Sequence, residues 1–471
     1  GKCLSFFKNY LINRNYRVAL NGCISDYYTA ESGVPQGSVL GPLLFLIYIN
    51  DLEMGIKSNI KFFADDSMIY SISDDPISTS RDLNHDIGVI EAWAKQWKMS
   101  FNPDVNKQAV EVLFSHKIKQ NHHPPLFFNN MVVKKVDEHK HLGLILDSKL
   151  TFSAHINEKI KKARKSLRLL RFLSSYLPLK SLQQIYKLYI RSLFDYGDVL
   201  YHIPSITNPF DSSISLHPLM NSLEQIQYEA ARIITGTWKG TNTNKLYEEL
   251  GFESLSDRRW GRRLTQFYKM HTSLTPTYLT NILPPKRRLL YGKTNPNIYE
   301  SIRCKSTRYK NSFLPDSVDS WNNLSIDLQE CNSLTIFKQK INTFIRPIPK
   351  SIFGIHNPKG LKCLFQLRVG LSPLRYDKKR HNFADTSSEI CECGATPEDA
   401  SHFLFFCSNF QAQRAQLMNQ VIPLLRNYNL MQNIHSPCLF LYGDKSISYS
   451  DNKTIILSTI EYILESGKFG T

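Results

Sequence analysis

The stretch Ile60–Ile72 most narrows what this chain can fold into, because two adjacent acids interrupt a run of β-prone residues. Aromatic and aliphatic side chains flank Asp65 and Asp66, which predicts two strands joined by a tight turn. Carboxylates in an apolar hairpin are costly to bury unless a divalent cation compensates their charge. In isolation the stretch favours an exposed, inert Asp-Asp turn, so a metal site needs support from its surroundings.

That support comes from a loop rich in glycine and proline, residues 32–45, upstream of the acidic pair. The loop contains Pro35, Gln36, Gly37 and Ser38 and runs into a short apolar helix. Small residues in such a loop let a backbone approach a nucleotide or a template strand closely.

These two stretches, in this order and at this distance, resemble the reverse transcriptases of non-LTR retrotransposons, in particular those of jockey-like elements. The resemblance implies an RNA-directed DNA polymerase that transfers nucleotides with two metal ions. It implies Mg²⁺ at Asp65 and Asp66, and nucleotide or template contacts at Gln36, Gly37 and Ser38. The implied partners are an RNA template, a DNA primer or target DNA, and deoxynucleoside triphosphates.

Two further segments continue the resemblance. Lys107 stands where the family has a lysine that neutralises or protonates the leaving pyrophosphate; a solvated lysine at a strand start is the alternative. Residues 141–147 resemble the primer grip, in which Leu142 and Gly143 approach the primer backbone. A core strand with a glycine bulge is the alternative for that segment.

The pattern of apolar residues predicts an α+β fold with four regions. Region 1–150 mixes helix and strand, including a strand at 109–115 and a long helix that buries Leu83, Ile87, Ile90, Ala94, Trp97 and Phe101. Region 151–275 is helical, 276–350 is a loop-rich connector with short helices, and 351–471 is mostly helical. The resemblance assigns these regions to a partial reverse-transcriptase palm, a helical thumb with connection, a connector, and a C-terminal region with a Cys/His zinc knuckle.

Within the helical region, the spacing predicts two amphipathic faces. One helix starts near Ile156, with apolar residues on one side and lysines and arginines over much of the rest. A second helix is predicted to pack through the residues that recur at three- and four-residue spacing, namely Leu182, Ile185, Tyr189, Leu193 and Tyr196.

The family has a further metal-binding Asp on a strand before the Pro-Gln-Gly loop, and no Asp here fits that role. Asp26 is the sole Asp before Val34, and no apolar strand precedes it. We therefore expect the C-terminal portion of such a polymerase, without the fingers and the first catalytic Asp and inactive on its own. A noncatalytic RNA- or DNA-binding remnant is the alternative.

Basic residues outnumber acidic ones by 58 to 41, and the net charge of +17 favours polyanionic partners. The resemblance places Lys161, Lys162, Lys165 and Arg168 on a thumb helix that contacts the nucleic-acid backbone; a solvated helix face is the alternative. The arginine-rich segment Asp257–Arg263 is a second candidate for nucleic acid, or equally for an acidic partner.

Two cysteines, a histidine and a third cysteine fall within 17 residues and match the ligands of a tetrahedral Zn²⁺ site: Cys391, Cys393, His402 and Cys407. Buried free thiols with a chance histidine are the alternative, since Cys-x-Cys departs from the common Cys-x2-Cys spacing. Jockey-like elements end in a knuckle of similar layout, which would grip template RNA or target DNA. Phe403 and Phe406 lie three residues apart and are expected to pack on one helical face.

An odd count of nine cysteines favours a reducing compartment with free thiols. The longest apolar run, Val39–Ile49, is far shorter than the ~20 residues that span a bilayer, so no membrane segment is predicted. The chain begins with Gly and lacks a leader, which suggests an interior start. We expect an intracellular ribonucleoprotein, nuclear and/or cytoplasmic and not secreted, whose oligomeric state is open.

Overall fold

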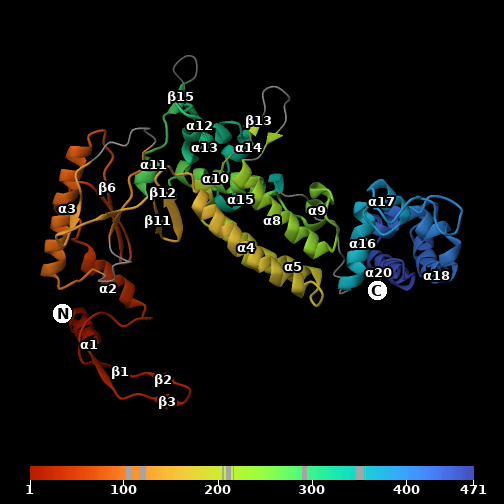
Figure 1. Ribbon diagram of the computed structural model, residues 1–471, viewed down its shortest axis with the longest axis horizontal. Coiled ribbons are helices and arrows are strands. Elements are labelled where there is room, and N and C mark those ends of the chain that lie inside the picture. The colour runs from red at the N-terminus through yellow and green to blue at the C-terminus, as the bar shows by residue number, and fades with distance from the viewer. Residues whose placement is uncertain are drawn as a thin grey trace. The chain divides into compact units, whose positions relative to one another are not determined.

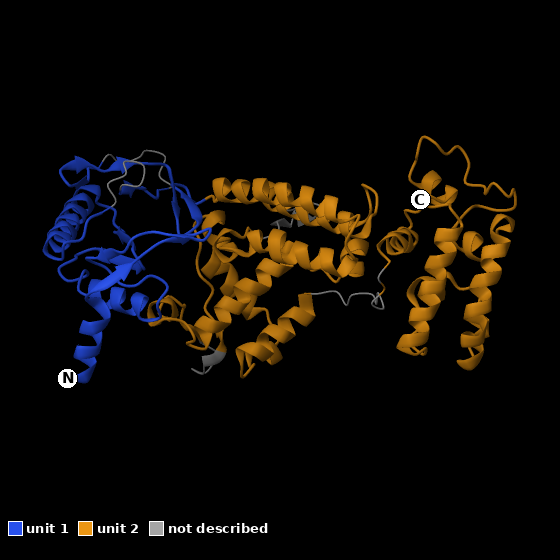
Figure 2. Ribbon diagram, turned by 90° about the horizontal axis from the view of Figure 1, so that it is seen from below, with its two compact units in different colours: residues 1–150 blue, residues 151–471 orange. Residues whose placement is uncertain are grey.

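The computed structural model (Figure 1) describes residues 1–101, 109–115, 123–203, 206–207, 214–215, 217–288, 294–345, 355 and 357–470. The chain divides into two compact units, residues 1–150 and 151–471 (Figure 2). Lys107 lies outside the described residues. The palm, thumb and connector boundaries inferred from the sequence stay predictions.

Unit 1 mixes helices with two-stranded sheets. Its helices are α1 (Lys2–Leu11), α2 (Leu40–Ile49) and α3 (Pro76–Gln96). Its antiparallel pairs are β1 (Arg14–Tyr16) with β4 (Tyr28–Ala30), β2 (Ala19–Leu20) with β3 (Cys23–Ile24), β5 (Asn59–Phe63) with β6 (Asp66–Tyr70), β8 (Phe127–Phe128) with β9 (Met131–Val132), and β11 (Glu138–His141) with β12 (Leu144–Asp147). Strands β7 (Val110–Glu111) and β10 (Lys134–Lys135) pair in parallel. Of the strand predicted at 109–115, only β7 forms.

Helix α3 follows the hairpin formed by β5 and β6 in the chain. It begins after Asp75, whose carboxylate accepts a hydrogen bond from the Ile77 amide. The predicted residues Ile87, Ile90 and Ala94 are buried, but the helix ends at Gln96, and Trp97 and Phe101 are exposed.

The same helix carries a buried acid that the sequence did not single out. Asp86 is fully buried, and its two carboxylate oxygens accept 2.8 Å hydrogen bonds from the amides of Lys57 and Ser58. Burial alone would raise the pKa of Asp86, but these hydrogen bonds outweigh it and lower the pKa. The carboxylate therefore ties α3 to the segment that leads into β5.

Unit 2 is mainly helical. Its first helices are α4 (Ser153–Leu173), α5 (Leu179–Ile185), the π-helix η2 (Tyr186–Arg191), α6 (Ser192–Asp195), α7 (Asp198–Tyr201), α8 (Pro218–Thr235), α9 (Thr243–Leu250) and α10 (Leu255–His271). The middle contains α11 (Thr277–Thr280), α12 (Thr307–Lys310), α13 (Phe313–Asn322), α14 (Ile326–Gln329) and α15 (Leu334–Ile345). The last part contains α16 (Pro358–Val369), α17 (Arg375–Arg380), η4 (His402–Phe406), η5 (Ser408–Phe410), α18 (Gln411–Asn427), η6 (Met431–Asn433), α19 (Pro437–Tyr442) and α20 (Tyr449–Glu465). Two short hairpins pair β13 (Ile206–Thr207) with β14 (Ile214–Ser215), and β15 (Lys286–Arg288) with β16 (Thr294–Tyr299).

Two clusters of buried side chains hold unit 2 together. The larger one combines residues of α4, α5, η2, α8 and α9 with residues of α16, η4 and α18 to α20. The smaller one surrounds Trp321 and includes Phe267 of α10 and Phe337 of α15. Side chains from 151–275 and from 351–471 thus share one core, although they are far apart in the sequence.

The packing face predicted after α4 is right at Leu182, which is buried, and at Ile185 and Leu193, which pack partly buried against the core, but it is wrong at Tyr189 and Tyr196. The segment is interrupted by η2, and the buried residues are Leu182, Tyr186, Ile190 and Phe194, whereas Tyr189 and Tyr196 are exposed. A π-helix closes i→i+5 hydrogen bonds, so its turn is wider and a spacing of four residues keeps side chains on one face. The α4 prediction is confirmed, with Ile156, Ile160, Ala163, Leu167 and Leu170 buried.

No helix among the described residues combines the length and the apolar character needed to cross a membrane.

Candidate active site and metal centre

The predicted acidic hairpin is present. Strands β5 and β6 pair from Asn59 opposite Tyr70 to Phe63 opposite Asp66, which leaves Ala64 and Asp65 as a two-residue turn. Ala64 has a φ of 52°, the positive value that two-residue hairpin turns favour because their twist then matches that of the strands. Asp65 therefore lies in the turn, and Asp66 begins β6.

Both acids are exposed. The hairpin does not bury their charge, because the turn places them at its tip, where water solvates them. Mg²⁺ is commonly held by one or two carboxylates, with water and substrate phosphates completing its shell, and two adjacent exposed carboxylates fit that mode. Within the described part of the chain, no third Asp, Glu, His or Cys joins this pair in a group able to hold a metal ion.

The segment predicted as the primer grip lies close to the acidic hairpin. Desolvation lowers the pKa of His139 on β11, the charge of His141 lowers it further, and the Asp66 carboxylate partly offsets both. The Asp66 carboxylate therefore lies near enough to β11 to act electrostatically on His139.

Leu142 and Gly143 form the turn between β11 and β12. His141 pairs with Leu144, and both turn residues have positive φ, 46° for Leu142 and 78° for Gly143. Gly143 is therefore neither inside a strand nor at a bulge. Glycine suits this position because a left-handed backbone has no Cβ penalty there.

The predicted nucleotide-binding loop separates into two parts. Gln36 and Gly37 form an exposed turn, with a φ of 79° at Gly37. The Ser38 hydroxyl donates to the Pro35 carbonyl at 2.7 Å and accepts from the Gly41 amide at 3.0 Å, so it fastens the loop to the start of α2. Ser38 thus has a local structural role, and ligand contacts at Gln36, Gly37 and Ser38 stay a prediction.

The four basic residues predicted on α4 are all exposed, on the side of the helix away from its buried face: Lys161, Lys162, Lys165 and Arg168. Lys162 forms an ion pair with Glu158 one turn earlier. The placement leaves this face accessible to a polyanion.

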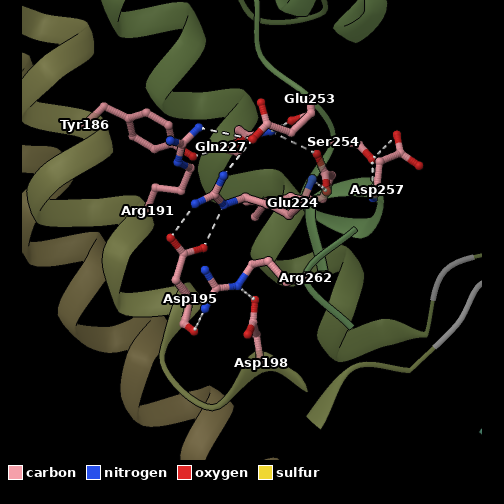
Figure 3. Close-up of polar contacts among 12 residues, drawn as sticks. Tyr186, Arg191, Asp195, Asp198, Glu224, Gln227, Glu253, Ser254, Asp257 and Arg262 are labelled. Atoms are coloured by element: carbon pink, nitrogen blue, oxygen red, sulfur yellow. Dashed lines mark hydrogen bonds and ion pairs between the residues drawn. The ribbon is translucent and has the colours of Figure 1, made fainter. Parts of the chain in front are cut away.

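The arginines of the second basic candidate, Asp257–Arg263, pair with acidic residues of this chain. Arg258 binds both oxygens of Asp195, at 2.8 and 2.7 Å, and also contacts Glu253 at 2.8 Å. Figure 3 shows Arg262 directed at Asp195 and Asp198, with 2.6 Å between Arg262 Nε and Asp198 Oδ2. These arginines join α10 to the segment from η2 to α7, and the candidate is corrected accordingly.

Burial governs the titration of this network. It raises the pKa of Asp198 to about 6, although the charge of Arg262 opposes the rise. It would also raise the pKa of Asp195, but hydrogen bonds from Arg258 outweigh it and lower that pKa. Burial, together with the charges of Arg259 and Arg263, lowers the pKa of His202 to about 2. The neutral His202 ring then accepts a 3.2 Å hydrogen bond from Arg259 Nε at its Nδ1.

The four predicted Cys and His residues converge. One ligand atom from each of Cys391, Cys393, His402 and Cys407 lies within 4.8 Å of all the others. Sγ of Cys391 is 3.6 Å from Sγ of Cys407, and Sγ of Cys393 is 3.2 Å from Nε2 of His402. The group can therefore hold a metal ion.

Local structure explains the convergence. The Cys391 amide donates to the Thr396 carbonyl, and the Gly394 amide, at a φ of 80°, donates to the Cys391 carbonyl, so the chain reverses between Cys391 and Thr396 with Cys393 in the turn. The Thr396 hydroxyl is 2.7 Å from His402 Nδ1 and fixes the ring so that Nε2 faces the cysteines.

The expected pairing of Phe403 with Phe406 is wrong. Segment η4 is a π-helix, in which Phe403 and Phe405 are buried while Phe406 is 58% exposed. Phe403 packs against Tyr462 and Phe410, with ring centroids 5.1 and 5.3 Å away.

Residues 2–146 match the family described as reverse transcriptase (RNA-dependent DNA polymerase). The chain is 28% identical over 295 residues to a probable RNA-directed DNA polymerase from transposon X-element of Drosophila melanogaster, over 59% of this chain and 30% of the relative. It is 24% identical over 287 residues to the RNA-directed DNA polymerase from mobile element jockey of the same species, over 59% of this chain and 29% of the relative. The chain thus spans about 30% of the length of these curated relatives. The resemblance seen in the sequence is confirmed.

Proposed function

We propose that this chain serves template-primed DNA synthesis in a non-LTR retrotransposon. The support is the match of residues 2–146 to the reverse transcriptase family and the homology of the chain to the RNA-directed DNA polymerases of jockey and X-element. The observation that carries the proposal is the exposed Asp65–Asp66 pair at a hairpin tip, inside the matched range and beside the β11–β12 hairpin. The substrates would be an RNA template, a DNA primer or target DNA, and deoxynucleoside triphosphates.

We assign unit 1 to a partial palm and α4 to the thumb. The assignment is supported by the order of the acidic hairpin, the β11–β12 hairpin and a long helix whose exposed face carries lysines and arginines. That face would follow the phosphate backbone of the template–primer duplex without reading its sequence.

The residues of unit 1 would have different roles in the reaction. Mg²⁺, when bound, supplies positive charge that stabilises the attacking and leaving oxygens at the reacting phosphate. Asp65 and Asp66 would hold the ion, the exposed Gln36–Gly37 turn would approach the nucleotide or template, and the Leu142–Gly143 turn would approach the primer. Lys107 keeps its proposed role at the leaving pyrophosphate.

The Cys/His cluster would hold a structural Zn²⁺. Tetrahedral Zn²⁺ with bonds of about 2.3 Å to sulfur places two sulfurs about 3.8 Å apart, close to the 3.6 Å between Cys391 and Cys407. Zinc analysis of the purified chain tests this, with Cys393→Ser combined with His402→Ala as the variant. A metal-free wild type, or the same zinc content in the variant, would reject the site.

Primer extension on an RNA template with Mg²⁺ tests the catalytic proposal. We expect little synthesis by this chain alone, because no third carboxylate joins Asp65 and Asp66 among the described residues. We do expect it to bind an RNA–DNA duplex, and to bind Mn²⁺, as a spectroscopic substitute for Mg²⁺, through the acidic pair. Asp65→Asn should lose this Mn²⁺ binding, while Glu53→Gln, which changes another exposed acid of unit 1, should retain it.

Failure to bind the duplex would refute the proposed function. Efficient extension that Asp65→Asn abolishes would refute the expected inactivity but not the function.

A noncatalytic role in binding RNA or DNA is the second candidate. It is favoured by the exposed cations of α4 and by the lack, among the described residues, of a third metal ligand beside Asp65 and Asp66. It predicts duplex binding that is unaffected by Asp65→Asn. We also propose an intracellular location, as a nuclear and/or cytoplasmic ribonucleoprotein, in keeping with nine cysteines that are all free thiols.

A further inference from the structure

An open cavity of about 270 Å³ lies where the ends of α4 and α8 meet α16. Three of its lining residues are cationic: Arg171 in the last turn of α4, Arg232 in the last turn of α8, and Lys362 on α16. No Asp or Glu is among the lining residues in the described chain. The cavity therefore concentrates positive charge from three separate helices.

The partners that these cations have among the described residues are weak, neutral or lacking at a buried nitrogen. Arg171 Nη2 is 3.4 Å from Glu229 Oε2, but both side chains are largely exposed, and such pairs contribute little. Arg232 Nε is buried and has no hydrogen-bond partner among the described residues. Lys362 Nζ donates to the Ser174 carbonyl at 2.9 Å, a neutral acceptor.

The position of Lys362 is fixed by packing. A Cβ added to Gly236 would lie 2.6 to 2.9 Å from three side-chain carbons of Lys362, so the aliphatic part of the lysine already fills the space beside this glycine. Gln366, one turn later on α16, donates to the Gly236 carbonyl at 3.2 Å. The ammonium group is thus held at the cavity instead of moving freely in solvent.

Favourable interaction with helix dipoles explains part of this arrangement. Cations near the C-terminal ends of α4 and α8 are stabilised by the negative ends of those helices. That accounts for Arg171 and Arg232 but not for Lys362, which comes from a third helix, nor for the unpartnered Arg232 Nε. Burial also lowers the pKa of Lys362, as expected for a cation without a nearby carboxylate.

We propose that this cavity binds a phosphate group, held by Arg171, Arg232 and Lys362. Arg171 follows Lys161, Lys165 and Arg168 on α4, so the cavity extends the exposed basic face of that helix. A phosphodiester of a bound nucleic acid is one source of the phosphate, and a small phosphate compound is the other. Phe172 and Tyr176, 63% and 69% exposed beside Arg171, offer rings on which bases stack, as in single-strand binding sites.

The favoured ligand of the cavity, a nucleic-acid phosphate, rests on the proposed nucleic-acid binding. The variants distinguish a failure of the cavity proposal from a failure of the proposed function. Arg232→Gln and Lys362→Met alter the cavity. Arg171→Gln, at an exposed position, is the cavity variant to use if either of these fails to fold. Lys162→Gln combined with Lys165→Gln alters only the α4 face. Lys338→Gln, on the exposed side of α15, is the matched control.

The first measurement is binding of the full chain to fluorescent single-stranded RNA and to an RNA–DNA duplex, by anisotropy over a range of salt concentrations. Each lost phosphate contact should reduce the slope of log K against log salt by about 1, and Lys338→Gln should leave it unchanged. The second measurement is calorimetric titration with inorganic pyrophosphate, which isolates binding of a small phosphate compound.

Cavity variants that lower the salt slope support a nucleic-acid phosphate. Cavity variants that lose only pyrophosphate binding support a small phosphate compound. If they change neither measurement while the α4 variant weakens duplex binding, the cavity proposal is overturned and the proposed function stands. If no variant changes binding, the cavity proposal and the proposed role of the α4 face are both overturned, while the proposed function stands as long as the chain still binds the duplex.

Discussion

The buried ion pair between Arg368 and Glu249 supports a quantitative prediction about the stability of unit 2. Arg368 Nη1 lies 3.0 Å from Glu249 Oε2, and both side chains are almost fully buried, 1% and 2% exposed. The pair joins α16 to α9. Arg368 Nε also donates to the Leu441 carbonyl at 2.7 Å, and its guanidinium lies 4.8 Å from the ring centroid of Tyr442.

Replacing Arg368 by methionine keeps the aliphatic bulk but leaves the Glu249 carboxylate buried without its cation. Breaking a buried pair in this way costs about 3–5 kcal/mol, and leaving the Leu441 carbonyl without its donor adds about 1 kcal/mol or more. We therefore expect Arg368→Met to lower the unfolding free energy of unit 2 by roughly 4–6 kcal/mol. Urea unfolding followed by circular dichroism measures this, and hydrogen exchange of α16 amides shows where the protection is lost.

The double variant Arg368→Met with Glu249→Leu separates the effect of the unpaired charge from that of lost packing. Apolar replacement of a whole buried pair is often neutral or stabilising, so the double variant should recover most of the loss. Arg375→Gln, which breaks an exposed pair with Glu392, should change stability very little. A single variant that costs under about 1 kcal/mol, or a double variant as unstable as the single, would refute the reasoning.

Three further predictions concern the metal centre, the α10 network and the β11–β12 turn. A zinc chelator should abolish hydrogen-exchange protection around Cys393, and protection that persists after metal removal would contradict a structural role. Because burial raises the pKa of Asp198 to about 6, the folded state binds more protons than the unfolded state between pH 4 and 6. This group therefore lowers stability by about 2–3 kcal/mol as pH rises from 4 to 7, a decline that Asp198→Asn should remove from the urea-unfolding profile. Gly143→Ala should lower the free energy of unfolding by about 1–2 kcal/mol because Gly143 has a positive φ. Gly88→Ala, in α3 with open space around it, should raise the free energy of unfolding by about 0.5–1 kcal/mol. Equal melting temperatures for the two variants would count against the turn assignment.

The features that the sequence predicted correctly are those whose signal is local. The acidic hairpin, the buried face of α4 and the Cys/His cluster each depend on residues a few positions apart, so periodicity and ligand spacing identify them. The exposure of Asp65 and Asp66 agrees with the tight turn that the sequence predicts, since the turn begins at Ala64, one residue before the acids.

The errors in the helical region have non-local causes. The sequence offers Arg258 and Arg262 as a candidate for nucleic acid or an acidic partner, because their actual partners Asp195 and Asp198 lie on distant segments of the same chain. Part of the packing face of the segment after α4 was misassigned, because its apolar residues fit an α-helix at several spacings. The wider turn of the π-helix η2 places Tyr186 and Ile190 in the core.

The shared core of unit 2 has a consequence for how the protein is made. Lys362 and Ser174, which are joined by a hydrogen bond, are 188 residues apart, and Arg368 and Glu249 are 119 apart. At about 5–20 residues per second, a ribosome needs roughly 10–40 s to produce α16 after α4. During that interval the nascent α4, α8 and α9 must keep their apolar faces from aggregating without the helices that cover them in the finished protein.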